Sequence, residues 1–412
     1  MRYGLIGGRL GHSYSRDIHA RLGSYGYELR ELAPDGLAPF LAARDFCAVN
    51  VTIPYKQAVI PLLDEVSDVA RQIGAVNVVL NDGGRLRGDN TDAAGFAALL
   101  RHAGVSVRGR KCLVLGTGGT SRTAEYVLRQ EGAAQVVHVS RVPKAGAVGY
   151  DEAARRHGDA QVLVNTTPVG MAPDVESSPI DLAPFGRLEG VVDVIYHPLR
   201  TQLVLAAQRR GIRACGGLAM LVAQAVYASA LFRGVEADAA QIDAIHRELL
   251  AEKRNIVLVG MPSSGKSTIG KFVAERSGRR FVDTDALAVE RAGCSIAELF
   301  ATRGEGAFRE LERSIVVEVS KGSGQVVATG GGVVLDGRNV DALRRDGCVF
   351  FLDRPLEKLL ATEDRPLSRT PEAVHRLYAE RLPLYRAAAD HVLDASRTPD
   401  DLVRDILERS DR

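Results

Sequence analysis

Short apolar runs alternate through most of the chain with longer stretches in which apolar and charged residues recur at helical spacing. Two clear apolar runs are residues 111–115 and residues 256–259, and a glycine-containing turn follows each of them. Such alternation is typical of strand–helix–strand units, whose parallel strands form a sheet that helices cover. The pattern therefore predicts an α/β protein.

The same alternation predicts three domains. Residues 1–100 form a first unit, residues 101–211 a second, and residues 253–412 a third that opens with a fresh strand. We expect residues 212–252 to return to the first unit. Across the junction, residues 236–254 place apolar side chains at helical spacing and contain neither proline nor glycine. A continuous helix, rather than a flexible tether, is predicted there.

The composition is that of an ordinary globular protein. The 412 residues are 46% hydrophobic and 25% charged, and the formal net charge of +2 gives no general attraction to nucleic acid or to an anionic membrane. No apolar stretch is long enough to cross a bilayer, and the N-terminus lacks the apolar core of a signal peptide. The five cysteines are isolated, which favours a reducing compartment. We expect a cytoplasmic protein that acts on small molecules and binds neither nucleic acid nor membrane, either as a monomer or as a homodimer.

A glycine-rich loop follows the run 111–115. Gly116, Gly118 and Gly119 allow a tight turn and a close approach of the backbone to a pyrophosphate, and the amides around Thr120 open a helix whose N-terminus attracts that charge. The loop therefore predicts a dinucleotide site in the second unit.

The end of the next strand indicates which dinucleotide binds. Residues 136–139 lead into Ser140 and Arg141, with Lys144 close behind, at the place where an NAD enzyme carries an acidic residue for the ribose diol. Basic side chains suit a 2′-phosphate instead, so NADP(H) is favoured. The alternative is a basic surface turn of no special function.

Polar side chains also cluster after strands of the first unit. They lie in residues 12–15, residues 50–56 and residues 88–92. The carboxyl ends of strands in an open α/β sheet form the ligand crevice, so these segments are expected to line one site. Taken singly, Lys56 is a solvated charge and Asp92 an N-cap for the helix that follows.

Taken together, these segments resemble the shikimate dehydrogenase family over nearly all of residues 1–250. Further matching stretches are residues 74–77, 165–171, 193–198 and 217–224. The resemblance implies that Ser13, Ser15 and Tyr196 hold the substrate carboxylate, that Thr52, Asn77, Asp92 and Gln224 hold its ring oxygens, and that Lys56 and Asp92 are the catalytic pair. A partly desolvated lysine beside a carboxylate suits proton donation to the alkoxide that forms when a ring ketone is reduced.

Some positions depart from the family pattern. Arg9 and Arg16 replace frequent prolines, and Val78 replaces a frequent threonine. Because quinate-using relatives share much of the pattern, these departures leave the choice between shikimate and quinate open.

A second phosphate-binding loop follows the run 256–259. Residues 260–267 match the pattern G-x-x-x-x-G-K-[ST], in which backbone amides cradle the phosphates, the lysine reaches the β and γ phosphates and the hydroxyl ligates Mg²⁺. The nucleotide-binding residues expected from this loop are Gly260, Ser264, Gly265, Lys266, Ser267 and Thr268. The loop alone fits a GTPase-like switch or an ATP sensor equally well.

The order of motifs after this loop resembles shikimate kinase, from about residue 255 to the end of the chain. The motifs are residues 283–285, 308–312, 328–332, 365–367 and 381–385. The resemblance implies that Asp285 contacts the attacking hydroxyl, that Asp283 supports the metal, that Arg309 and Arg381 grip the substrate carboxylate, that Gly331 and Gly332 approach the ring, and that Arg365 lies on a closing lid. The lid segment is shorter than is usual in the family.

The sequence thus predicts a bifunctional enzyme with a substrate domain, a Rossmann NADP domain and a P-loop kinase domain. The first activity would be NADPH-dependent reduction of 3-dehydroshikimate, and the second would be MgATP-dependent phosphorylation of shikimate to shikimate 3-phosphate. Two alternatives are a half that only senses its nucleotide and regulates the other, and a dehydrogenase that prefers quinate.

Overall fold

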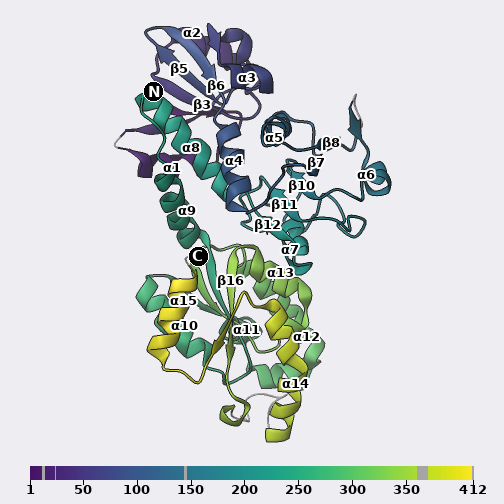
Figure 1. Cartoon of the computed structure of the whole chain (residues 1–412). Coiled ribbons are helices and arrows are strands. Elements are labelled where there is room, and N and C mark those ends of the chain that lie inside the picture. Colours follow the sequence, from purple (N-terminus) through teal and green to yellow (C-terminus); the bar gives the residue numbers. More distant parts are fainter. Residues whose placement is uncertain (12–13, 24, 143–145, 360–369, 411–412) are drawn as a thin grey trace. The chain divides into compact units, whose positions relative to one another are not determined.

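A computed structural model describes residues 1–11, 14–23, 25–142, 146–359 and 370–410. The chain forms two compact units, Met1–His246 and Arg247–Arg412, so the division falls inside helix α9, Ala239–Lys253. Each unit combines helices with largely parallel sheets (Figure 1), which confirms the α/β class. None of the helices in the described part of the chain is both long and apolar enough to cross a membrane.

The first lobe of the N-terminal unit contains a six-stranded sheet in the order β2-β1-β3-β5-β6-β4. Strands β1, β2 and β3 are parallel, and β5 runs antiparallel to both β3 and β6. The strands are β1 Tyr3–Gly7, β2 Tyr27–Glu31, β3 Ala48–Val51, β4 Glu65–Val66, β5 Val78–Asp82 and β6 Arg85–Asp89. The parallel strands direct their carboxyl ends, and the loops that follow them, to one edge of the sheet.

Helices connect these strands or, in the case of α4, lead from β6 to the second lobe. They are α1 Ser15–Leu22, α2 Leu37–Ala43, α3 Asp68–Ile73 and α4 Asp92–His102, with 3₁₀ turns at Pro34–Gly36 and Ile60–Leu62. Local chemistry explains the bounds of α3: the Ser67 hydroxyl accepts a hydrogen bond from the Ala70 amide at its start, and Gly74 ends it with φ of 69°.

The second lobe contains six parallel strands in the order β12-β11-β10-β7-β8-β9. The strands are β7 Lys111–Leu115, β8 Gln135–Val139, β9 Ala147–Val148, β10 Val162–Asn165, β11 Gly190–Asp193 and β12 Arg213–Cys215. The central strands are almost wholly buried because helices cover both faces of the sheet. Helices α6 and α7 pack on one face and α5 on the other; they span Tyr150–Arg156, Gln202–Arg209 and Gly119–Gln130.

Helix α8, Leu218–Arg233, returns the chain to the first lobe. It packs along α4 and against α1, and Figure 1 shows α4 and α8 side by side. Strand β12 pairs with β11 and so belongs to the second sheet. The return therefore begins at Leu218, a few residues later than the sequence boundary at 212, because residues 213–215 complete the edge of the parallel sheet.

The C-terminal unit is built on five parallel strands in the order β14-β15-β13-β16-β17. They are β13 Asn255–Val259, β14 Arg280–Asp283, β15 Gln325–Ala328, β16 Gly347–Asp353 and β17 His391–Asp394. Every residue of β13 is buried, as expected for the central strand of a sheet covered on both faces.

Helices cover this sheet on both sides. Helices α10 Lys266–Ser277 and α15 Pro399–Ser410 pack on one face. The other helical segments are α11 Thr284–Ala292, α12 Ile296–Val319, α13 Gly337–Arg345 and α14 Pro371–Ala388, with 3₁₀ turns at Val333–Leu335 and Leu356–Lys358. Residues of α11 to α14 form the apolar core on the opposite face.

Candidate active sites

One cavity of about 410 Å³ lies in the N-terminal unit, bordered by β1, β3, α4, α5 and α8. Its lining includes eight residues that the sequence assigned to substrate or cofactor: Ser15, Thr52, Lys56, Asn77, Asp92, Thr120, Tyr196 and Gln224. The fold brings these side chains together from segments spread over more than 200 residues of chain. Ser13 lies outside the described residues. We call this the N-terminal cavity.

The centre of this cavity is an ion pair. Lys56 Nζ lies 2.6 Å from Asp92 Oδ2, and their side chains are 20% and 9% exposed. Asp92 is the first residue of α4, whose N-cap is Thr91, so the carboxylate does not cap the helix but faces the lysine. A partly desolvated ammonium with a fixed acceptor is suited to donate a proton or a hydrogen bond to a substrate oxygen.

Asn77 holds the other oxygen of Asp92. Its Nδ2 donates to Asp92 Oδ1 at 2.9 Å and to Thr91 Oγ1 at 3.0 Å, while its Oδ1 accepts from the Thr91 amide at 2.7 Å. Asn50, which the sequence left without a role, lines the cavity; its Nδ2 donates to the Asn77 carbonyl at 3.3 Å, and its Oδ1 accepts from Tyr27. Only the position of Asn50, at the head of the polar segment 50–56, could have indicated this role.

Tyr196 forms the wall contributed by the loop after β11. Its ring lies 5.4 Å from that of Tyr14, centroid to centroid, and burial raises the pKa of its phenol above the usual value. The hydroxyl therefore stays protonated at neutral pH and can donate to a carboxylate.

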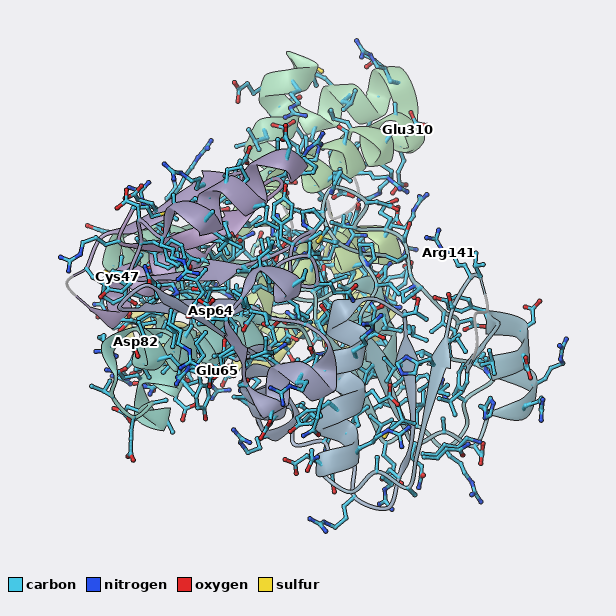
Figure 2. The ribbon with its side chains drawn as sticks, turned by 90° about the horizontal axis from the view of Figure 1, so that it is seen from above. Cys47, Asp64, Glu65, Asp82, Arg141 and Glu310 are labelled. Atoms are coloured by element: carbon cyan, nitrogen blue, oxygen red, sulfur yellow. The ribbon has the colours of Figure 1, made fainter. Side chains whose placement is uncertain are left out.

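The dinucleotide loop has the backbone that its glycines predict. Gly116 has φ of 111°, and a Cβ there would lie 2.8 Å from Thr166 Oγ1. Gly118 and Gly119 border open space at the start of α5, where a phosphate can approach the amides. Arg141 is exposed on the loop after β8 (Figure 2), and the Val142 amide donates to Ser140 Oγ at 3.3 Å. Lys144 lies outside the described residues.

The P-loop turns sharply between β13 and α10. Gly260 and Gly265 have φ of 152° and 96°, a conformation that side chains disfavour. Lys266 Nζ donates to the carbonyls of Gly260 at 2.9 Å and Met261 at 2.8 Å, so its ammonium folds back over the loop. Ser264 is buried within the same turn.

Ser267 and Asp283 face each other across the mouth of the P-loop. Ser267 Oγ donates to Asp283 Oδ2 at 2.6 Å, while Asp283 Oδ1 accepts from the amides of Asp285 and Ala286 and caps α11. Hydroxyl and carboxylate oxygens are the protein donors that Mg²⁺ prefers, so the pair fits the predicted metal site.

A cavity of about 610 Å³ extends from this loop, and we call it the P-loop cavity. It is lined by ten of the residues that the sequence assigned: Gly265, Lys266, Ser267, Thr268, Asp283, Asp285, Arg309, Gly331, Gly332 and Arg381. Gly260 and Ser264 are not part of its lining but shape the loop. Arg365 lies outside the described residues.

The two arginines converge on one stretch of backbone. Arg381 is 4% exposed and its Nη1 donates to the Gly331 carbonyl at 3.1 Å. A Cβ on Gly332 would lie 2.1 Å from Arg309 Nη1, and one on Gly331 would lie 2.8 Å from Pro262 Cδ. A side chain at Gly332 would therefore collide with a guanidinium, and one at Gly331 would collide with the P-loop. This requirement for glycine is separate from the predicted approach of the backbone to a substrate ring.

Glu312, for which the sequence predicts no role, completes this wall. Its Oε2 accepts from Arg309 Nη1 at 2.8 Å, and Glu305 accepts from the other side of the same guanidinium at 2.9 Å. Burial raises the pKa of Glu312, and Arg309 opposes that rise. Its neighbour Glu310 is exposed on the outer side of α12 (Figure 2). Glu310 and Glu312 point to different sides of α12 because they are two positions apart on a helix. The sequence does not indicate which side of the helix faces the cavity.

Comparisons with known proteins found relatives of both units. The family model of the shikimate dehydrogenase substrate binding domain matches residues 5–79, and that of shikimate kinase matches residues 262–411. A shikimate dehydrogenase (NADP(+)) from Halothermothrix orenii is 39% identical over 265 residues, which cover 57% of this chain and 91% of that protein. The shikimate 5-dehydrogenase of Thermus thermophilus, solved with NADP(H) and shikimate, is 34% identical with a TM-score of 0.55, over 60% of this chain and 99% of that one.

These findings define an NADP-type oxidoreductase of two lobes joined to a P-loop kinase domain. The chain belongs to the shikimate dehydrogenase family, and its C-terminal unit carries a shikimate kinase domain. It therefore combines the domains of two shikimate-pathway enzymes. A quinate dehydrogenase from Corynebacterium glutamicum, solved with NAD, is also similar, at 29% identity and a TM-score of 0.54 over 61% of this chain and 99% of that one.

Proposed function

We propose that the N-terminal unit reduces 3-dehydroshikimate to shikimate with NADPH and that the C-terminal unit phosphorylates shikimate at its 3-hydroxyl with MgATP. The observation that carries the first half is the Lys56–Asp92 pair in a cavity lined by the other expected ligands. For the second half it is the convergence of Arg309 and Arg381 beside the P-loop.

In the reduction, NADPH supplies the hydride when bound. Lys56 donates to the carbonyl oxygen and protonates it as the alkoxide forms, while Asp92 holds the ammonium and accepts from a neighbouring ring hydroxyl. Asn77 orients Asp92, and Tyr196 with Ser15 and Ser13 binds the carboxylate. Thr52 and Gln224 complete the ring contacts. Gly116, Gly118, Gly119 and Thr120 hold the pyrophosphate, and Ser140, Arg141 and Lys144 hold the 2′-phosphate.

In the phosphorylation, Asp285 accepts the proton of the 3-hydroxyl as it attacks the γ-phosphate. Arg309 and Arg381 bind the substrate carboxylate by charge-assisted hydrogen bonds, and Lys266 swings from its own loop to the phosphates. Ser267 and Asp283 would hold Mg²⁺, which neutralises phosphate charge when bound. Arg365 is proposed to close over the transferred group.

The test is a coupled assay with separate variants. The purified chain, given 3-dehydroshikimate, NADPH and MgATP, is expected to form shikimate 3-phosphate. Lys56→Ala should abolish only NADPH oxidation, and Lys266→Ala only ADP release from added shikimate. If one change abolished both activities, one half would be a regulatory nucleotide sensor instead.

Two finer points follow from the same proposal. NADP(H) is preferred over NAD because of Arg141, so Arg141→Ala should raise the KM for NADPH and leave that for NADH nearly unchanged. Shikimate is preferred over quinate, and comparable rates of oxidation of the two acids would contradict that preference. We further propose a cytoplasmic protein with a substrate domain of residues 1–100 and about 212–252, a Rossmann domain of 101–211 and a kinase domain of 253–412. Within the return segment 212–252, strand β12 pairs with the Rossmann sheet, and the contacts with the first lobe begin at α8.

A further inference from the structure

A fully buried carboxylate at the end of β11 belongs to neither set of proposed ligands. Asp193 is 0% exposed and accepts from Asn165 Nδ2 at 3.1 Å on both oxygens, from Thr201 Oγ1 at 2.7 Å and from the Ile195 amide at 3.0 Å. Each of these donors is uncharged. Burial raises the pKa of the carboxyl group to about 6, and the three donor residues oppose that rise. Evolution of a core for stability alone seldom retains a lone buried carboxylate, because burying its charge is costly.

One side of Asp193 leads to the dinucleotide loop. Asn165 Oδ1 accepts from the Thr167 amide at 3.0 Å and from Thr167 Oγ1 at 2.7 Å, which fixes the turn after β10. In that turn, Thr166 Oγ1 donates to the Leu115 carbonyl at 2.6 Å and lies against Gly116. The position of Asn165 therefore fixes the turn that packs against the cofactor loop at Gly116.

The other side leads to the substrate wall. The Ile195 amide that bonds Asp193 immediately precedes Tyr196, which lines the N-terminal cavity. The Ile195 carbonyl accepts from the Gly217 amide at 2.7 Å, and Gly217 is the N-cap of α8, the helix that carries Gln224. Thr201, the third partner, is also the N-cap of α7. One carboxylate thus joins both sides of the cavity.

We propose that Asp193 is a positioning residue that couples the cofactor loop to Tyr196, so that cofactor and substrate each favour the binding of the other. The proposal rests on the function proposed for the dehydrogenase half. The physical basis is that these donors share one carboxylate. A shift of the turn after β10 breaks the hydrogen bonds from Asn165 to Asp193, and this changes the hydrogen bonds that Thr201 and Ile195 donate to the same group.

The first experiment needs no ligand or turnover. Asp193→Asn replaces one acceptor oxygen by an NH2 group, which cannot accept from the surrounding donors. Amide hydrogen exchange in the unliganded protein is therefore expected to become faster in both residues 166–171 and residues 194–199. Asp181→Asn is the matched control, because that exposed carboxylate in the same lobe accepts from a nearby loop amide, Ala183, at 3.0 Å. Faster exchange in one stretch alone, or in neither, would overturn the proposal. An inactive wild-type enzyme would contradict the proposed function instead, and leaves this result valid.

A second pair of variants guards against misfolding of Asp193→Asn. Thr201→Val removes one donor, whereas Thr201→Ser keeps the hydroxyl. The readout is the Kd of NADPH with and without saturating shikimate, a pair of ligands that cannot react. NADPH is used as the probe because shikimate is also proposed to bind the kinase half. We expect shikimate to tighten NADPH binding in the wild type by roughly tenfold, a common size of coupling, and the effect of NADPH on shikimate binding to the dehydrogenase half is the same factor by linkage. Thr201→Val should reduce this ratio and Thr201→Ser should preserve it. An unchanged ratio in Thr201→Val and Asp193→Asn, or a ratio of one in the wild type, would refute the coupling.

Discussion

At the scale of single residues, each cavity contains a charged side chain that neighbouring side chains hold in one orientation. Asp92 is held by Asn77 and still faces Lys56. Arg309 is held by Glu305 and Glu312, and Gly332 leaves the space that its guanidinium occupies. Because such groups are oriented before a ligand arrives, little of the binding free energy is needed to order them.

Gly332→Ala is expected to weaken substrate binding in the kinase half. The added Cβ would lie 2.1 Å from Arg309 Nη1, so the guanidinium must move away from the cavity. Loss of one charge-assisted hydrogen bond, about 1.5–3 kcal/mol, predicts a KM for shikimate that rises roughly tenfold or more, with a smaller change in the KM for ATP. Gly337→Ala is the control, because a Cβ there meets open space. Equal effects of the two variants would contradict this account.

His19 makes the stability of the N-terminal unit depend on pH. Its ring is 0% exposed and stacked on Tyr27 at 3.8 Å, and burial lowers the pKa of its imidazole to about 3. Between pH 6.5 and 3 the unfolded chain therefore binds a proton that the folded chain does not, so this contribution to stability is complete above pH 6.5 and is lost as the pH falls. His19→Phe keeps the stacking and removes the titration. Urea midpoints at pH 7.5 and pH 5 should differ less for the variant than for the wild type, and an equal difference would count against this assignment.

At the scale of elements, the start and bend of α12 determine where its polar residues point. Ser295 and Glu298 form a capping box at its N-terminus, and Gly304 interrupts it with φ of 77°. The helix resumes after this kink and carries Arg309 and Glu312 to the P-loop cavity. The motif 308–312 lies on this helix, and the direction of the helix there depends on one glycine conformation.

Gly304→Ala is therefore expected to affect both stability and binding. With φ of 77° and ψ of 170°, Gly304 occupies a backbone region that costs a residue with a Cβ about 1–3 kcal/mol, although the structure has room for the methyl group. We expect the kinase unit to lose about that much free energy of unfolding, and the KM for shikimate to rise as α12 straightens. Gly306→Ala, two residues further on and also in open space, should be neutral or stabilising because it adds a helix former. Denaturant titration and kinase kinetics on both variants measure the difference.

At the scale of the whole molecule, the two units have separate apolar cores and separate nucleotide loops. Among the described residues, two apolar clusters consist of residues between 256 and 407, and three others consist of residues of the two N-terminal lobes. Two independent cores allow each unit to unfold in its own transition.

Ligands should therefore stabilise the two transitions selectively. NADP⁺ is expected to raise only the unfolding temperature of the N-terminal unit, and ADP only that of the C-terminal unit. At a concentration of about 100 times Kd, each ligand should contribute about 2.7 kcal/mol to its own unit. Calorimetry of the full chain, with Lys266→Ala to identify the ADP-sensitive transition, tests this. A single transition that both ligands shift would show that the units unfold together.

The sequence by itself determined the α/β class, the two phosphate-binding loops, and eight and ten of the residues that line the N-terminal and P-loop cavities. These features are local or motif-bound: Gly116 and Gly265 must adopt positive φ wherever the rest of the chain lies, and a strand such as β13 is apolar because both its faces are covered. Tertiary structure alone decided that Asp92 faces Lys56 rather than capping α4, that Glu312 and not Glu310 supports Arg309, and that Asp193 joins two loops. Each of these depends on contacts between residues distant in sequence, whose geometry is set by packing of sheets and helices and leaves no local signal in the amino-acid pattern.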